Sequence, residues 1–363
     1  MQFSLLSRLT KNIIVMVEIF EIFTLEDVMT NKAMFLMAPG LVELNEIELP
    51  AIKANEVLVK SEYSAISAGT ELANFNDLPN TVRRYPRSFG YNAVGIVTEV
   101  GADVKGYAVG DRVLCYFAGG HRLYSVCKTS MLCKIPEGVD PRDAALVIIG
   151  GFGLEGARMT RCEIGESALV VGCGLLGQFA LQALRCMGAT PVIAIDFNEE
   201  RLAIAKECGA DLVLRPDDPD LKAKVKAATD GRGINCAVEV TGSAQALVTA
   251  LELMAPHGRI ALTGCTRVSD VPIDFYKLVH VPGIQLLGAH TKVRPNGDSR
   301  PGYWVPHDDH RTLLRHIAKG NINVKPLWND EFNPADCTKV YKDLAENKNP
   351  PLGNLFNWSL LGE

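Results

Sequence analysis

The chain has 363 residues, which is enough for two domains with separate hydrophobic cores. Its 47% hydrophobic and 22% charged residues are ordinary for a soluble globular protein, and a net charge of −5 without a basic stretch argues against nucleic acid as a partner. Ten cysteines are scattered singly without a Cys-x-x-Cys pair, which favours a reduced, cytoplasmic protein and speaks against a structural zinc site.

Residues 1–30 are expected to be an N-terminal extension outside the core. An apolar run from Ile13 to Phe23 is interrupted by Glu18 and Glu21, so it is too short and too charged to span a membrane. A signal peptide is the less favoured alternative, because no small-residue cleavage site follows cleanly. We therefore expect no membrane partner and a first domain that begins near Asn31.

Short strands separated by turn residues dominate the next hundred residues. Alternating side chains predict strands at 33–37, 41–46 and 56–63. A loop from Ser64 leads into a short helix, and glycine-punctuated segments from Arg87 and Gly106 enter further strands. This pattern predicts a β-barrel-like domain. Residues 141–160 then form a helical connection with Pro141 in its first turn.

The stretch 168–196 predicts a strand, a turn, a helix and a second strand. Gly172, Gly174 and Gly177 have G-x-G-x-x-G spacing, which suits a tight turn, close approach of a pyrophosphate and close helix packing. The helix N-terminus offers free N–H groups to phosphate. Asp196 ends the second strand about 20 residues later, where it can accept hydrogen bonds from both ribose hydroxyls and would repel a 2′-phosphate. The sequence therefore predicts NAD rather than NADP as the cofactor.

Strands and helices alternate beyond this motif, which predicts a doubly wound parallel sheet. The further strands are expected at 211–214, 236–240, 259–263 and 284–287. The helices between them are expected at 199–208, 220–229 and 244–254. A polar, proline-rich loop follows, then two more helices at 309–318 and 334–346. The fold class is therefore α/β.

Two further motifs carry a family resemblance. Gly90-x4-Gly95-x-Val97-x2-Val100-Gly101 is followed by Gly110-Asp111-Arg112-Val113, and the glycine-rich turn comes after them in the chain. From about Asn31 onward the chain resembles the medium-chain dehydrogenase/reductases, the zinc-type alcohol dehydrogenase superfamily. The resemblance implies a GroES-like β-barrel catalytic domain over 31–157 and 290–363, and a Rossmann domain that binds NAD over 158–289. It implies these cofactor contacts: Gly172, Gly174, Leu175, Leu176, Gly177, Asp196, Arg201, Thr241, Gly242, Gly264, Ala289 and His290.

The zinc ligands of this superfamily are missing from the matching positions. Ala68 stands where the first Cys ligand is expected, Tyr91 where the His ligand is expected, and the third ligand falls near Gly151. These residues cannot build a tetrahedral nitrogen and sulfur site, so we expect no metal and a zinc-independent enzyme. The sequence from Ser64 to Glu71 resembles that of a zinc-lacking branch of the superfamily, which includes bacteriochlorophyllide hydroxyethyl dehydrogenases.

Four residues are candidates for the proton chemistry that hydride transfer requires. Thr70 matches the family's hydroxyl relay, and Tyr91 would project into the cleft with a pKa that would need lowering. His121 and Glu155 are further candidates. The alternatives stay open: Thr70 as a helix cap, Tyr91 as packing that fills the metal position, His121 as a satisfied loop histidine, and Glu155 as a helix-dipole partner.

The loop after the last predicted sheet strand is rich in cationic and aromatic groups. Arg294, Arg300, Tyr303 and Trp304 are candidate substrate residues, since arginine suits carboxylate or phosphate and aromatic faces suit sugars. A surface or dimer-contact loop is the alternative.

The leading function is a zinc-independent, NAD-dependent dehydrogenase of a secondary alcohol, on a sugar, polyol or hydroxy acid. The alternatives are a quinone or enoyl reductase and a non-catalytic nucleotide-binding protein. The resemblance also implies a homodimer or higher homo-oligomer, through the strand predicted at 284–287.

Overall fold

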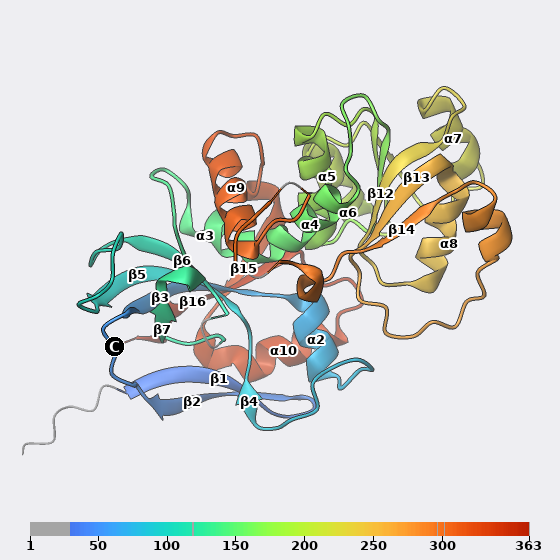
Figure 1. The fold of residues 1–363 in the computed structure, drawn as a ribbon. Helices are drawn as coiled ribbons and strands as arrows, with labels where there is room; N and C mark the ends of the chain where they lie inside the picture. The colour runs from blue at the N-terminus through green and yellow to red at the C-terminus, as the bar shows by residue number, and fades with distance from the viewer. Residues whose placement is uncertain (1–29, 118–119, 296, 301, 363) are drawn as a thin grey trace, which may run out of the picture.

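The computed structural model describes residues 30–117, 120–295, 297–300 and 302–362 (Figure 1). The predicted N-terminal extension lies outside the described residues except for Thr30, which begins the first strand. Across the described ranges, no helix is both long enough and apolar enough to cross a membrane.

Two sheets form the part of the molecule on the left of Figure 1. The smaller has the order β2-β1-β4, with β1 (Thr30–Ala38), β2 (Leu41–Glu48) and β4 (Arg87–Ser88). The larger has the order β15-β16-β3-β5-β6-β8, with β7 also paired to β3. Its strands are β3 (Glu56–Ile66), β5 (Asn92–Val100), β6 (Arg112–Tyr116), β7 (Tyr124–Lys128), β8 (Leu132–Lys134), β15 (Trp328–Phe332) and β16 (Gly353–Asn357).

The sequence pattern did not predict β15 and β16. Both are short, and β16 becomes a strand by pairing antiparallel with β3, Asn354 opposite Ile66. A partner nearly 300 residues away supplies these hydrogen bonds, so the local sequence carries little strand signal. The C-terminal segment thereby completes the barrel-like sheet.

The predicted doubly wound sheet is confirmed on the right of Figure 1. Six parallel strands have the order β11-β10-β9-β12-β13-β14. They are β9 (Ala168–Val171), β10 (Val192–Ile195), β11 (Leu212–Leu214), β12 (Ile234–Glu239), β13 (Met254–Leu262) and β14 (Gln285–Gly288), with helices α5 (Leu175–Cys186), α6 (Glu199–Glu207), α7 (Leu221–Ala228) and α8 (Ala244–Leu253). The chain order reverses between β9 and β12, where open α/β sheets bind ligands at the carboxyl ends of the strands.

The remaining helices differ slightly from the predicted boundaries. They are α2 (Ala68–Phe75), α3 (Pro141–Ala145), α4 (Val147–Met159), α9 (Pro306–Ala318) and α10 (Cys337–Glu346). The helix predicted over 141–160 is two helices that meet at Leu146, and α9 begins three residues early because Pro306 occupies its first position. Short 3₁₀ turns lie at Thr129–Met131, Thr291–Val293, Lys325–Leu327, Pro334–Asp336 and Trp358–Leu361, and a π turn lies at Tyr276–His280.

Helix α4 lies between the two parts and carries four glycines. A methyl group at Gly153 would stand 2.4 Å from the carbonyl oxygen of Leu176, and one at Gly156 would stand 2.4 Å from Oγ1 of Thr263. These glycines let α4 pack close against α5 and against the end of β13, although each costs about 1 kcal/mol of helix propensity relative to alanine. The boundaries between domains at 157/158 and 289/290 stay a prediction.

Candidate functional site

The glycine-rich turn has the geometry that a pyrophosphate site requires. Gly172 has φ +97°, and a methyl group at Gly177 would stand 1.9 Å from the Gly172 carbonyl oxygen, so both positions need glycine. Gly174 is the N-cap of α5, and a methyl group there would meet no atom within 4 Å. The N-terminus of a twelve-residue helix therefore faces open space across a residue that has no side chain.

Asp196 stands at the end of β10, beside this turn. One carboxylate oxygen accepts from the Cys173 N–H at 2.7 Å and the other from the Asn198 N–H at 2.8 Å. Each oxygen keeps a further lone pair for a ribose hydroxyl. Arg201, also predicted to bind the cofactor, donates its guanidinium to the Pro350 carbonyl at 2.9 Å.

Behind the turn lies a buried acid that sequence analysis missed. Glu239 ends β12 with 2% exposure and accepts hydrogen bonds from the N–H groups of Thr241 and Gly242. Burial raises the pKa of Glu239 above its usual range, and the bonds from Thr241 and Gly242 oppose that rise. The Thr241-Gly242 turn packs directly on Gly264, where a methyl group would stand 2.2 Å from the Gly242 nitrogen. The loops after β12 and β13 are thus held together.

Ala289 and His290 follow β14. Ala289 is buried and donates its N–H to the Leu262 carbonyl at 3.1 Å. His290 uses Nδ1 to accept from the Lys292 N–H at 3.1 Å, capping a short 3₁₀ turn. Roles for these two residues toward a cofactor stay predictions.

The structure brings together two of the predicted catalytic hydroxyl groups. The Tyr91 phenol donates to Oγ of Ser67 at 2.6 Å and is also hydrogen-bonded to the Thr70 side chain. Ser67 is the N-cap of α2, and Thr70 lies exposed in its first turn, so the alternative that Thr70 caps this helix is wrong. Tyr91 stacks on Phe117, with ring centroids 5.3 Å apart.

The environment of Tyr91 does not supply the lowered pKa that a role as a proton acceptor would need. Burial raises the pKa of the Tyr91 phenol above its usual value, and the bonds to Ser67 and Thr70 offset this only in part. The nearby Glu71 raises it further. Tyr91 is therefore a neutral proton donor at physiological pH, not a phenolate base.

His121 does not reach the cleft as a proton acceptor, which corrects a second expectation. Its ring is fully buried, with Nδ1 2.8 Å from Ser64 Oγ and Nε2 3.1 Å from Glu71 Oε2. The backbone of His121 pairs with Met34 and Phe89, which draws the residue inward. His121 is thus a core residue whose polar contacts are satisfied within the fold.

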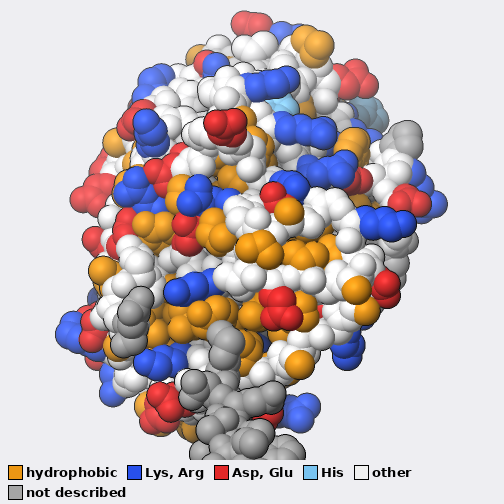
Figure 2. Space-filling view, turned by 90° about the vertical axis from the view of Figure 1, so that its left-hand side faces the viewer, with side chains coloured by type: hydrophobic (Ala, Val, Ile, Leu, Met, Phe, Trp, Pro, Cys, Tyr) orange, Lys and Arg blue, Asp and Glu red, His pale blue; other side chains and the backbone are white. Residues whose placement is uncertain are grey.

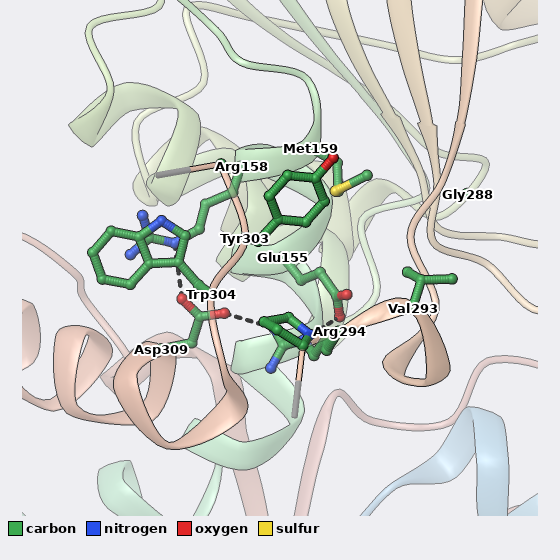
Figure 3. Close-up of a pocket in the computed structure, with 11 residues that line it drawn as sticks. Glu155, Arg158, Met159, Gly288, Val293, Arg294, Tyr303, Trp304 and Asp309 are labelled. Atoms are coloured by element: carbon green, nitrogen blue, oxygen red, sulfur yellow. Dashed lines mark hydrogen bonds and ion pairs between the residues drawn. The ribbon is translucent and has the colours of Figure 1, made fainter. Parts of the chain in front are cut away.

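Two residues predicted for different roles form one ion pair. Glu155 Oε2 lies 2.7 Å from Arg294 Nε, and Arg294 Nη2 lies 2.6 Å from Asp309 Oδ2 (Figure 3). Asp309 is also bound by Arg158 Nε at 2.8 Å. Burial raises the pKa values of Glu155 and Asp309, and Arg294 opposes both rises. Because Glu155 lies well beyond the first turn of α4, its alternative role as a helix-dipole partner is wrong.

These side chains line a cavity of about 100 Å³ between α4, α9 and the loop after β14 (Figure 3). Its wall carries Trp304, whose ring stacks under the Arg158 guanidinium at 4.0 Å, and Tyr303, which is 44% exposed. Arg300 lies over the Tyr303 ring at 4.9 Å. Of the four predicted substrate residues, Arg294, Tyr303 and Trp304 line this cavity and Arg300 adjoins it.

Protein partners bind two of the three guanidinium nitrogen atoms of Arg294. Its side chain is 4% exposed and also donates through Nη2 to the Gly151 carbonyl at 3.2 Å, whereas Nη1 is buried without a hydrogen-bond partner among the described residues. The Nε2 atom of the neighbouring His310 ring is also buried without a hydrogen-bond partner among the described residues. Burial and Arg294 lower the pKa of His310 to about 3, so this imidazole is neutral.

Sequence analysis missed several members of this site. Each of them contacts a residue that the sequence analysis names: Ser67, Glu71, Arg158, Asp309 and Glu239. The signal for Glu71 was its place directly after Thr70 in the motif. Arg158 and Asp309 gave no signal, because their pairing joins residues 151 positions apart.

Comparison with known proteins gives two adjoining matches. Residues 53–177 match the family model of the alcohol dehydrogenase GroES-like domain, and residues 176–296 match that of the zinc-binding dehydrogenases. D-guloside 3-dehydrogenase of Escherichia coli is 28% identical over 338 residues, 87% of this chain and 96% of that protein.

Two further relatives cover most of the chain. L-threonine 3-dehydrogenase of Pyrococcus furiosus is 28% identical over 324 residues, 81% of this chain and 89% of that protein. The crystal structure of galactitol-1-phosphate dehydrogenase from Escherichia coli superimposes with a TM-score of 0.77 at 22% identity, over 90% of this chain and 99% of that one. This last likeness shows the fold.

Proposed function

The chain belongs to the zinc-type alcohol dehydrogenase superfamily and is an oxidoreductase, and on that premise we propose that it transfers hydride between a secondary alcohol or its ketone and NAD, without zinc. The observation that carries the proposal is the hydroxyl cluster of Tyr91, Ser67 and Thr70. Tyr91 and Ala68, which follows Ser67, are the sequence positions at which the resemblance implies metal ligands.

A nicotinamide dinucleotide fits the residues at the glycine-rich turn. The open space at Gly174 and the free N-terminus of α5 suit a pyrophosphate, and the fixed Asp196 carboxylate suits a ribose diol. When bound, the nicotinamide ring supplies the hydride acceptor or donor. The negative charge of Asp196 beside the turn supports NAD over NADP.

Zinc does not fit the corresponding positions. Ala68 and Gly151 offer no ligand atom, and the Tyr91 phenol is held protonated by burial. The charge that develops on the substrate oxygen must then be met by hydrogen bonds. Tyr91 O–H is suited to donate to that oxygen, and Ser67 Oγ and Thr70 can pass the proton between Tyr91 and the exposed side of α2.

The cavity beside the Arg294–Glu155 ion pair supports a class of substrate. The aromatic walls of Trp304 and Tyr303, beside the Arg294–Glu155 pair, suit a molecule with several hydroxyl groups. D-guloside 3-dehydrogenase and L-threonine 3-dehydrogenase, to which the chain is similar, are named for polar secondary alcohols. We infer a sugar, polyol or hydroxy acid.

The test is NADH formation from NAD⁺ over a panel of such alcohols, with and without a strong chelator. Turnover insensitive to the chelator, lost by at least about 100-fold in both Tyr91→Phe and Thr70→Val, supports the proposal. Tyr107→Phe is the matched control, because its phenol bonds the Leu132 carbonyl at 2.9 Å outside this site. Full turnover in both site variants would refute the proton path, and NADPH consumption by enones instead would favour an enoyl or quinone reductase.

Assembly and location are part of the same proposal. β14 is the edge strand of the parallel sheet, and Phe275, Tyr276 and Val281 are exposed before it, which supports a homodimer formed through this edge. All ten cysteines are free thiols, which supports a cytoplasmic location. Light scattering after size-exclusion chromatography would give the molar mass in solution and so distinguish a dimer from a monomer.

A further inference from the structure

Two cysteines meet at the end of the parallel sheet opposite the cofactor turn. Cys162 follows α4, and Cys236 lies near the amino end of β12, opposite Ala168 at the start of β9. The two sulfur atoms and a carboxylate oxygen of Glu166 all lie within 4.8 Å of one another. None of these residues contributes to the proposed dehydrogenase chemistry.

A fixed cation faces this cluster. Arg259 Nη2 lies 2.9 Å from Cys236 Sγ and forms an ion pair with Glu166. Its position is set by the backbone, since Nε donates to the Thr160 carbonyl at 2.6 Å. The charge of this guanidinium acts to lower the thiol pKa of both cysteines, and the thiolate is the reactive form of cysteine.

The two thiols differ in access. Cys236 is fully buried, whereas Cys162 is partly exposed in a segment that is otherwise solvent-facing. A small solute can therefore reach the Cys162 sulfur, whereas the Cys236 sulfur is shielded from solvent. This is the arrangement of a reactive cysteine next to a resolving one.

We propose that Cys162 and Cys236 form a peroxide-sensitive thiol pair that closes to a disulfide. The Cys162 thiolate attacks the peroxide, so that a sulfur–oxygen bond forms, the O–O bond breaks and hydroxide leaves as water after taking a proton. Cys236 then gives up its proton and attacks the Cys162 sulfenic acid, forming the S–S bond and releasing a second water. Two thiols and one hydrogen peroxide thus give one disulfide and two waters.

The surrounding charges support this division of roles. A hydrogen bond from the Cys236 thiol, aided by Arg259, lowers the pKa of Cys162 against burial, Glu166 and Glu163, which raise it. The hydrogen bond with Cys162 and burial raise the pKa of Cys236, and Arg259 opposes this rise. The Cys236 thiol also donates to Glu166 Oε2 at 3.2 Å, which raises the pKa further and keeps the proton on Cys236. Cys162 is consequently the nucleophile and Cys236 the proton-bearing partner.

A metal is the competing occupant of two thiols and a carboxylate. A zinc ion would need the contacts to Cys236 and Glu166 that Arg259 already makes, so a second cation would have to displace the guanidinium. The geometry favours the redox pair, and metal capture becomes an outcome of the test.

The experiment treats the reduced full chain with a small excess of hydrogen peroxide at pH 7, blocks free thiols, and maps peptides by mass without reduction. The expected product is a 162–236 cross-linked peptide, lighter by two hydrogen atoms. Cys236→Ser should stop at a Cys162 sulfenic acid that a dimedone probe traps. Cys186→Ser is the control that leaves the cross-link unchanged, since Cys186 is an exposed thiol with a backbone contact to Asn321.

Arg259→Gln tests the cation separately, by the rate at which iodoacetamide alkylates Cys162. Without the Arg259 charge the pKa of Cys162 rises and its thiolate fraction falls, and the higher nucleophilicity of the less acidic thiol offsets part of that loss, so the rate should fall roughly threefold. The proposal is overturned if no cross-link forms while Cys162 and Cys186 alkylate at equal rates. It is also overturned if the reduced chain retains one zinc ion that Cys162→Ser loses.

Discussion

Replacement of Arg294 by methionine tests how the buried ion network holds the site together. Arg294 is the shared partner of Glu155 and Asp309, and its side chain is 4% exposed. Asp309 still has its ion pair with Arg158, 2.8 Å long in the wild type, whereas Glu155 loses the one ion pair that it makes among the described residues. Removing one partner of a buried pair costs about 3–5 kcal/mol, because the other charge stays desolvated. We expect Arg294→Met to lose this much free energy of unfolding at pH 8.

The loss should shrink at low pH. Burial already raises the pKa of Glu155, and without Arg294 the carboxyl can take up a proton in the folded state. A group whose folded pKa lies above its unfolded value contributes stability that is present below the unfolded pKa and lost as pH rises through the folded one. The variant should therefore be less destabilised at pH 5 than at pH 8.

The assay is urea unfolding of the wild type and variants, followed by tryptophan fluorescence at both pH values. Glu155→Gln combined with Arg294→Met should recover part of the loss, because no buried charge is then left unpaired at that position. Arg300→Met is the matched control at an exposed arginine, with an expected change within about 0.5 kcal/mol. A loss below about 1 kcal/mol for Arg294→Met at pH 8, or no recovery in the double variant, would refute the reasoning.

Three further predictions concern the cofactor half of the site. Gly177→Ala should disrupt the turn and weaken NAD binding at least about tenfold, because its methyl group would stand 1.9 Å from a backbone oxygen. Gly174→Ala, whose methyl group meets no protein atom within 4 Å, should keep the wild-type unfolding temperature yet still weaken NAD binding in a titration. Asp196→Ser should shift the ratio of kcat/KM values for NAD and NADP toward NADP by roughly tenfold or more, and an unchanged ratio would count against its ribose role. The wild type should lose free energy of unfolding as pH rises through the raised pKa of Glu239, and Glu239→Gln should reduce this dependence on pH. Urea unfolding from pH 4 to 8 measures both.

Local sequence patterns are enough to predict the α/β class, the parallel sheet and the glycine-rich turn. These features depend on local patterns: apolar runs for buried strands, glycines at Gly172 and Gly177 where no side chain fits, and an acid at the end of the next strand. The pairing of the Thr70 and Tyr91 hydroxyl groups is also predicted, because both residues occupy positions that match the motif of the family.

The role of each polar side chain depends on packing between distant segments of the chain. His121 and Glu155 were predicted from their residue type, but protonation and access depend on partners such as Glu71 and Arg294, which lie 50 and 139 positions away in the chain. The same holds for the pKa of Tyr91, which burial raises although a role as a proton acceptor would need it lowered. Desolvation and long-range pairing arise only when distant segments pack together, and no local pattern of residues encodes them.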